Sequence, residues 1–251
     1  MNDDDVLIHV PTKRSFPKVR LVDPQPYGYR LLAVVVDRRL PFAYAWESRR
    51  KRRLLASLNK QAAHLRESDG VRDVTVFKAL VVPPGRGRFL KERPNVRVAR
   101  YDIVVLVETT TPEQAERLDG NPHWSATQLE IRSVAPDPFE IFGTNVRSLG
   151  KVDHKRAGVF LFNYFYADRL DRNLAVFEYT AGWFQDQTRL DNSTLMLPKT
   201  KTDYTIINHA RWDRLRDIVP ALLIKSSFRD YVLRYFEANQ TAAMPILYRL
   251  A

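Results

Sequence analysis

Residues 157–167, AGVFLFNYFYA, are the apolar stretch from which the order of elements in the second half of the chain can be worked out. A short run of this kind, rich in aromatic residues and free of proline, is typical of a β-strand buried on both faces. A helix is expected next, over residues 171–190. Its spacing brings four apolar side chains to one face: Leu174, Phe177, Ala181 and Phe184. The second half therefore begins as a strand followed by a helix.

Three further strands and one further helix are expected before the end of the chain. NSTLMLP (192–198) and DYTIINHARW (203–212) follow each other as strands without a helix between them. A helix is expected from about Ser226, and AMPILYRLA (243–251) closes the chain as a strand. The order in residues 151–251 is thus strand, helix, strand, strand, helix, strand.

The first half shows the same order of elements less clearly. Strands are expected at 29–41, 71–84, 96–109 and 139–150, and helical segments at 46–68 and 112–134. Direct comparison indicates a weak duplication, in which residues 31–40 align with 161–170 and residues 101–112 with 204–215. Few identities are shared, so this alignment depends on the order of elements and on strand register.

The adjacent middle strands determine the predicted topology. Because no helix separates them, the pattern favours an antiparallel sheet with both helices on one face, which is the ferredoxin-like arrangement (βαββαβ). We therefore predict an α+β protein with an extended N-terminal arm (1–29) and two tandem ferredoxin-like units (30–150 and 151–251). Each unit leaves one sheet face without helices, and that face must be buried. Packing the two bare faces together is expected to form a barrel-like core within the chain.

The composition limits the chemistry that the protein can perform. There is no cysteine among the 251 residues, which excludes disulfides, thiolate nucleophiles and cysteine-based metal sites. Neither a signal-peptide pattern nor an apolar run of membrane-spanning length occurs, so a cytoplasmic protein without a membrane partner is expected. The five histidines are far apart in sequence and form no HExxH motif, so no metal site is expected.

The positive charge is spread along the chain. The net charge of +11 arises from 40 basic and 29 acidic residues, and a dispersed excess attracts anions without marking a binding face. The one dense basic run, RRKRR at residues 49–53, lies near an expected helix start and lacks interleaved aromatic residues for base stacking. We interpret it as a surface cluster, with anionic-polymer binding as the alternative, and expect no nucleic-acid partner.

Two polar residues stand within strands that are otherwise apolar. His209 lies in TIINHARW and Asn163 in LFNYF, whereas the aligned residues of the first half are Leu106 and Ala33. A buried polar side chain costs roughly 1–3 kcal/mol when its hydrogen bonds are not made. A histidine can accept a proton near neutral pH, and an amide can hold a substrate oxygen. These residues therefore need either partners in the core or a function, and the sequence leaves both alternatives open.

Three short motifs of the second half carry a resemblance to a known family. They are Asn163 in the first strand, Trp212 followed by Asp213 in HARWD, and the helix start KSSFRDYV. With these motifs the second half resembles the dimeric α+β barrel superfamily, and most nearly its antibiotic biosynthesis monooxygenase group. The resemblance implies a pocket between sheet and helices. It also implies a cofactor-free oxygenase acting on polycyclic phenols, in which a substrate carbanion passes an electron to oxygen.

The predicted site combines these motifs with the two polar residues. His209 is expected to act as the base and Asn163 to hold the substrate oxygen. The side chains expected to contact a small aromatic or polyketide-like molecule are Trp212, Tyr164, Trp183 and Arg211. A homodimer is left open as the assembly.

Haem is not expected as a cofactor. Haem-degrading relatives of the monooxygenase group carry a histidine four residues after the helix phenylalanine, and that position, counted from Phe228, is Val232. We therefore expect no cofactor. Two alternatives remain open: a haem-binding relative, and a non-catalytic barrel with a stress, storage or ligand-binding role, in which the polar residues only complete the core.

Overall fold

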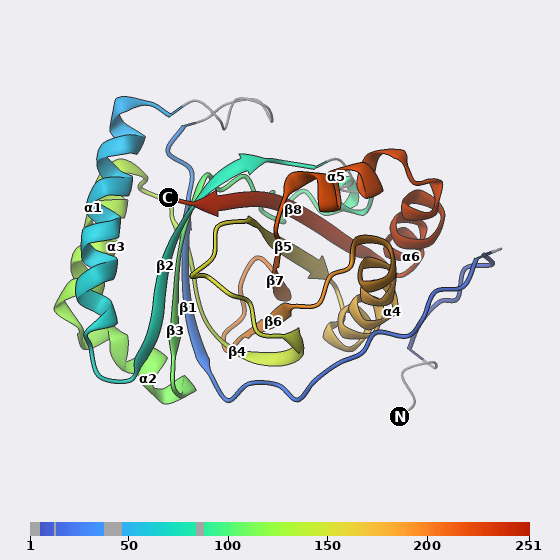
Figure 1. Ribbon diagram of the computed structural model, residues 1–251, viewed down its shortest axis with the longest axis horizontal. Coiled ribbons are helices and arrows are strands. Elements are labelled where there is room, and N and C mark those ends of the chain that lie inside the picture. The colour runs from blue at the N-terminus through green and yellow to red at the C-terminus, as the bar shows by residue number, and fades with distance from the viewer. Residues whose placement is uncertain (1–5, 13, 38–46, 84–87) are drawn as a thin grey trace.

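The computed structural model describes residues 6–12, 14–37, 47–83 and 88–251. Its centre is a closed barrel of eight antiparallel strands (Figure 1). The strands are β1 (Gly28–Val34), β2 (Val71–Val81), β3 (Ile103–Thr109), β4 (Phe139–Gly150), β5 (Val159–Ala167), β6 (Ser193–Pro198), β7 (Ile206–Trp212) and β8 (Thr241–Leu250). The predicted barrel-like core is confirmed.

The pairing order of the strands is the same in the two halves of the chain. The ring runs β1-β3-β2-β8-β5-β7-β6-β4, and β4 pairs with β1 to close it. The first half is therefore ordered β4-β1-β3-β2, and the second half β8-β5-β7-β6. The two halves join where β2 pairs with β8 and where β4 pairs with β6.

Helices cover the outside of the barrel in two separate layers, one on each half (Figure 1). The first layer contains α1 (Arg49–Arg66), α2 (Pro112–Arg117), α3 (Pro122–Val134) and the short 3-10 helix η4 (Leu118–Gly120). The second contains α4 (Leu170–Thr188), α5 (Leu215–Ile224), the π-helical turn η5 (Phe228–Leu233) and α6 (Arg234–Ala238). A further 3-10 helix, η3 (Phe89–Glu92), lies in the connection from β2 to β3. Within the described ranges, no helix is long and apolar enough to cross a membrane.

Three apolar cores hold these layers together. Aromatic rings fill the barrel interior, among them Phe77, Phe160, Phe162, Tyr164, Tyr204 and Tyr248. The core between the first helix layer and the barrel is mainly aliphatic, whereas the core under the second layer mixes aliphatic and aromatic side chains. The side of the sheet to which a residue points therefore decides whether it meets the barrel interior or a helix layer.

The described N-terminal arm lies along the outside of the second half (Figure 1). Asn239 anchors it to the end of α6, because its Oδ1 accepts from the backbone N–H of Ile8 at 2.7 Å and its Nδ2 donates to the carbonyl oxygen of Ile8 at 3.0 Å. Farther along, a Cβ on Gly182 of α4 would lie 2.0 Å from the carbonyl oxygen of Pro17. Only a glycine therefore allows this close approach of the arm to α4.

Several local expectations differ from the structure. Sequence patterns predict no helix at α5, whose interior contains Pro220, a residue that disfavours a helix interior. The strand expected from residue 96 begins only at Ile103, because the Asp102 carboxylate before it accepts hydrogen bonds from the backbone N–H groups of Val36 and Asp37. Residues 38–46 and 84–87, which include the ends of two expected strands, lie outside the described residues.

Candidate functional site

His209 and Asn163 lie on opposite faces of the same sheet. In the pairing of β5 with β7, His209 is opposite Phe162 and Asn163 is opposite Asn208. Directly opposed residues of an antiparallel pair point to the same face, and neighbours along one strand point to opposite faces. His209 therefore points into the barrel, whereas Asn163 points toward the helix layer. The prediction that both residues act on one substrate is wrong, because the sheet separates them.

Tyr164 and Arg211 lie on the barrel side of the sheet, with His209. Tyr164 is fully buried among the aromatic rings of the interior. Arg211 lies at the end of the barrel, with its guanidinium carbon 6.0 Å from the centre of the Phe160 ring, and its Nη2 donates to the carbonyl oxygen of Ala157 at 2.6 Å. Neither side chain points toward the helix layer of the second half, as Asn163 does.

A small cavity, called the helix-side cavity, lies between the sheet of the second half and its helix layer. Its volume is about 30 Å³, which is room for about two water molecules. Its polar lining residues are Asn163, Asn208, Ser193 and Thr180, and its aromatic lining residues are Phe165, Phe177, Phe184, Trp212 and Phe236. The structure thus brings Asn163 and Trp212 together. Trp183 lies in the same core without lining the cavity, and its Nε1 donates to Ser227 Oγ at 3.1 Å.

Asn163 carries an unpaired hydrogen-bond acceptor at this cavity. Asn163 is only 8% exposed, and its Oδ1 has no hydrogen-bond partner within the described ranges. The neighbouring polar groups are satisfied: Asn208 Oδ1 accepts from Ser193 Oγ, and Trp212 Nε1 donates to Thr188 Oγ1 at 3.0 Å. A buried acceptor without a partner costs roughly 1–3 kcal/mol. A bound molecule that donates a hydrogen bond would remove that cost.

The first half carries aliphatic side chains where the second half carries these two amides. Leu32 is opposite Val105 in β1 and β3, as Asn163 is opposite Asn208 in β5 and β7, and the two pairs occupy matching positions in their strands. The counterpart of Asn163 is therefore Leu32 and not Ala33, which points into the barrel. A register shift of one residue moves a side chain to the other face, and this explains the error of the sequence alignment.

A second polar cluster lies at one end of the barrel, and sequence reasoning missed two of its members. His154 Nδ1 lies 2.7 Å from Asp73 Oδ2, and His154 Nε2 lies 2.9 Å from His209 Nε2. His209 Nδ1 lies 2.9 Å from the carbonyl oxygen of Leu161. Burial lowers the pKa of His209 well below its ordinary value, and the nearby His154 lowers it further. His154 stands in the segment that joins the two halves of the chain, and this position was the only sequence feature that pointed to the cluster.

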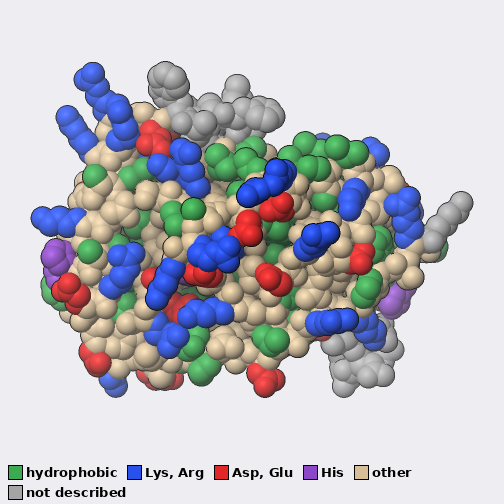
Figure 2. All heavy atoms as spheres, in the orientation of Figure 1, with side chains coloured by type: hydrophobic (Ala, Val, Ile, Leu, Met, Phe, Trp, Pro, Cys, Tyr) green, Lys and Arg blue, Asp and Glu red, His purple; other side chains and the backbone are tan. Residues whose placement is uncertain are grey.

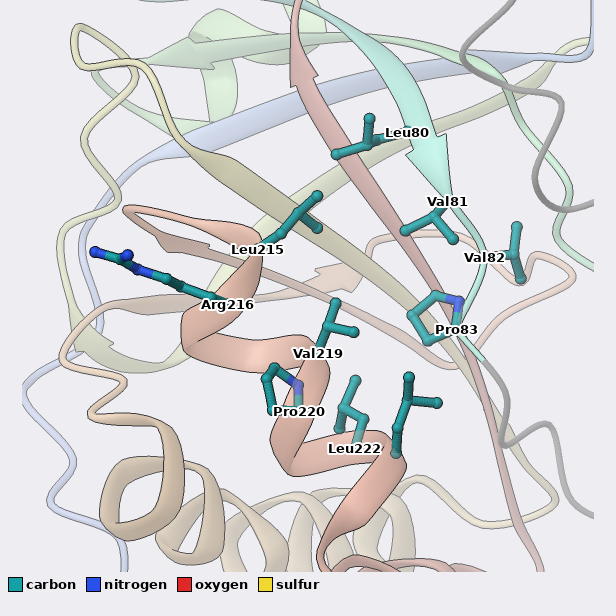
Figure 3. A pocket seen from close by; sticks show the side chains of 10 residues that line it. Leu80, Val81, Val82, Pro83, Leu215, Arg216, Val219, Pro220 and Leu222 are labelled. Carbon is teal, nitrogen blue, oxygen red and sulfur yellow. The ribbon is translucent and has the colours of Figure 1, made fainter.

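A separate apolar groove of about 440 Å³ lies between the end of β2 and helix α5 (Figure 3). Aliphatic side chains such as Val81, Val219 and Leu222 line it. Its charged lining residue is Arg216, whose side chain points away from the β2 side chains in Figure 3. Ligand sites usually combine apolar walls with a few convergent polar groups. The described lining of this groove has no convergent polar groups, so the groove is not the candidate site.

The helix-side cavity does not fit a haem. Its volume of about 30 Å³ is far below that of a porphyrin, and none of its described lining residues is a histidine. Val232, at the position where haem-degrading relatives carry their histidine, is fully buried in the core. Across the described part of the chain, no group of three or more His, Asp or Glu side chains is placed to hold a metal ion.

The basic run at residues 49–53 is only partly a surface cluster. It begins helix α1, and its four arginines are exposed, but Lys51 is buried and forms an ion pair with Asp102 at 3.2 Å. Figure 2 shows Lys and Arg side chains interspersed with Asp and Glu over the visible face. One of the five cations therefore stabilises the core and is not available to a partner.

The sequence itself matches no protein-family model and no curated protein. Solved structures do match over most of the chain. An anthrone oxidase-like protein has a TM-score of 0.60 at 8% identity, with 90% of this chain and 92% of that protein covered. A putative monooxygenase from Fusobacterium nucleatum subsp. nucleatum has a TM-score of 0.57 at 7% identity, with 90% and 93% covered. At such low identities the likeness shows a shared barrel fold.

Proposed function

We propose that the protein binds a small aromatic molecule in the helix-side cavity of the second half. The observation that carries this proposal is the unpaired Oδ1 of Asn163, which borders a cavity with aromatic walls. Because Oδ1 is an acceptor, the ligand should present an O–H or N–H group to it. The rings of Phe177, Phe184 and Trp212 offer faces and edges against which an aromatic ligand can pack.

The ligand has to enlarge the cavity on entry. An engineered protein cavity of about 150 Å³ binds benzene, whereas the helix-side cavity has a volume of about 30 Å³. Phe236 of α6 lines the cavity, and α6 follows directly on the π-helical turn η5. Single π-helical turns within helices occur frequently at functional sites. We propose that displacement of the Phe236 ring opens this wall.

Oxygenation of the bound molecule without a cofactor is a second candidate function. The observation in its favour is that two structures with TM-scores above 0.5 are named as an anthrone oxidase-like protein and a putative monooxygenase. The described lining of the cavity contains no ionisable side chain, and His209 is on the other face of the sheet. The substrate would therefore arrive already ionised and pass one electron to dioxygen, and the substrate radical and superoxide would combine into a peroxide. The Asn163 Nδ2 group would donate to the substrate oxygen atom.

The two halves of the chain have matching strand orders. We infer that they are tandem ferredoxin-like units, of which only the second keeps a ligand site. The matching strand orders β4-β1-β3-β2 and β8-β5-β7-β6 support this view, as does the matching order of strands and helices along the chain. The aliphatic pair Leu32 and Val105 in place of the two amides supports a purely structural role for the first unit.

Titration with 2-naphthol, a small aromatic molecule with one hydroxyl group, tests the proposal. Quenching of tryptophan fluorescence reports binding, because Trp212 lines the cavity. We expect saturable quenching of the wild type and affinity at least about tenfold lower in Asn163→Leu, which removes the acceptor and fills the space. Asn59→Leu is the matched control, because Asn59 is exposed on α1, and it should bind as the wild type does. Equal affinity of Asn163→Leu and the wild type would overturn the proposal.

Oxygen consumption in the same solutions separates oxygenation from binding alone.

A further inference from the structure

His154 and His209 bring two ring nitrogens to one point at the end of the barrel. His154 comes from the segment that joins β4 to β5, and His209 from β7. Their Nε2 atoms lie 2.9 Å apart. His209 is 2% exposed, and the His154 side chain is 7% exposed. The two rings therefore meet in a place that is almost closed to solvent.

Each ring is held from behind by a group that can only accept a hydrogen bond. The Asp73 carboxylate lies 2.7 Å from His154 Nδ1, and the carbonyl oxygen of Leu161 lies 2.9 Å from His209 Nδ1. Both Nδ1 atoms must therefore carry a hydrogen. With Nδ1 protonated, the neutral form of each ring has its lone pair on Nε2. The lone pairs of His154 and His209 thus point at the same small space.

Two lone pairs at 2.9 Å repel each other unless a cation lies between them. A proton on one Nε2 is the simplest such cation, and a metal ion is the other. The arrangement behind the rings matches the usual surroundings of metal-binding histidines, which donate their second ring N–H to a carboxylate or a backbone carbonyl. Asp73 is the carboxylate behind His154, and the Leu161 carbonyl is the backbone acceptor behind His209.

A solvent-facing cleft lies next to the pair and shares lining residues with it. A hollow of about 10 Å³ borders both rings and is also lined by Glu108 and Met196. His154 and Glu108 line in addition an outer cleft of about 480 Å³. The charged residues of this cleft, apart from His154, are three cations and three anions: Arg72, Lys151, Lys155, Asp73, Glu108 and Asp153. A cation entering the cleft therefore meets no net repulsion from these side chains.

We propose that His154 and His209 are the two protein ligands of a site for one transition-metal ion of the kind that imidazole binds, such as Zn²⁺. Metal–nitrogen distances of about 2.0 Å at a tetrahedral angle separate two nitrogens by about 3.3 Å, so the rings need to move apart by only a few tenths of an ångström. The hollow beside the rings has room for about one water molecule, which would supply a third ligand. The ion takes the place of the shared proton, which leaves to solvent. This site is on the opposite face of the sheet from the helix-side cavity and does not depend on the proposed ligand there.

Calorimetric titration of the EDTA-treated protein with ZnCl₂, repeated in two buffers with different heats of ionisation, tests this site. We expect one Zn²⁺ per chain and release of about one proton per ion. His154→Gln and His209→Gln should each weaken binding by about 100-fold or more. Asp73→Asn keeps both ligands but loses the carboxylate behind His154, and it should weaken binding by about 10–100-fold. Circular dichroism establishes that each variant is folded.

The matched control addresses the other pair of neighbouring histidines. The rings of His64 and His123 stack at 4.9 Å, and His64 is exposed on α1, so this pair tests whether any two neighbouring histidines account for the binding. His64→Gln should leave the binding unchanged. Loss of binding in His64→Gln, unchanged binding in His154→Gln, or the lack of saturable binding to the wild type would each overturn the proposal, and the pair would then hold a proton only.

Discussion

The pair Leu32 and Val105 in the first half and the pair Asn163 and Asn208 in the second half occupy the same place in the fold. Each pair spans two neighbouring strands and faces a helix layer. The first pair is packed in an aliphatic core, whereas the second borders a cavity and leaves one acceptor unpaired. The first half forms the same pairing of neighbouring strands without an amide at this position. The barrel itself therefore requires no amide there. We propose that the unpaired acceptor of Asn163 serves ligand binding.

Leu32→Asn gives the largest expected effect, because it places an amide in the mainly aliphatic core under the first helix layer. The residue is 1% exposed. Loss of a buried leucine side chain together with burial of an unpaired amide should lower the free energy of unfolding by about 3 kcal/mol or more. Denaturation with urea measures it. Leu129→Asn on exposed α3 is the control and should change stability by less than about 0.5 kcal/mol. A loss below about 1 kcal/mol for Leu32→Asn would mean that both halves tolerate the amide equally.

Asn163→Leu is the reverse exchange and should have a smaller effect of opposite sign. It removes an unpaired acceptor and fills part of the cavity, so the free energy of unfolding should rise by about 1 kcal/mol. Urea denaturation without ligand again provides the measurement. A fall of more than about 1 kcal/mol would show that Asn163 stabilises the fold in its own right, and the contrast with Leu32 would lose its functional meaning.

Sequence patterns were sufficient to predict the barrel-like core, but they were insufficient to predict which residues share a site. Alternating and helical periodicities within short segments predict the strands and most of the helices, because these patterns are local. The face to which Asn163 points depends on register, and an alignment with few identities paired it with Ala33 on the wrong face. The contacts of His154 with Asp73 and His209 join residues 81 and 55 positions apart, and no local pattern encodes them.

The central claim is that a ligand contacts Asn163 on the helix side of the second half. The most direct measurement follows the side-chain amide signals of Asn163 in a ¹H–¹⁵N NMR spectrum, assigned by their loss in Asn163→Leu, during addition of 2-naphthol. The account predicts that these signals and those of Asn208 shift and saturate together, while the signals of exposed Asn59 stay in place. Binding that leaves the Asn163 signals unchanged, or no binding at all, would contradict it.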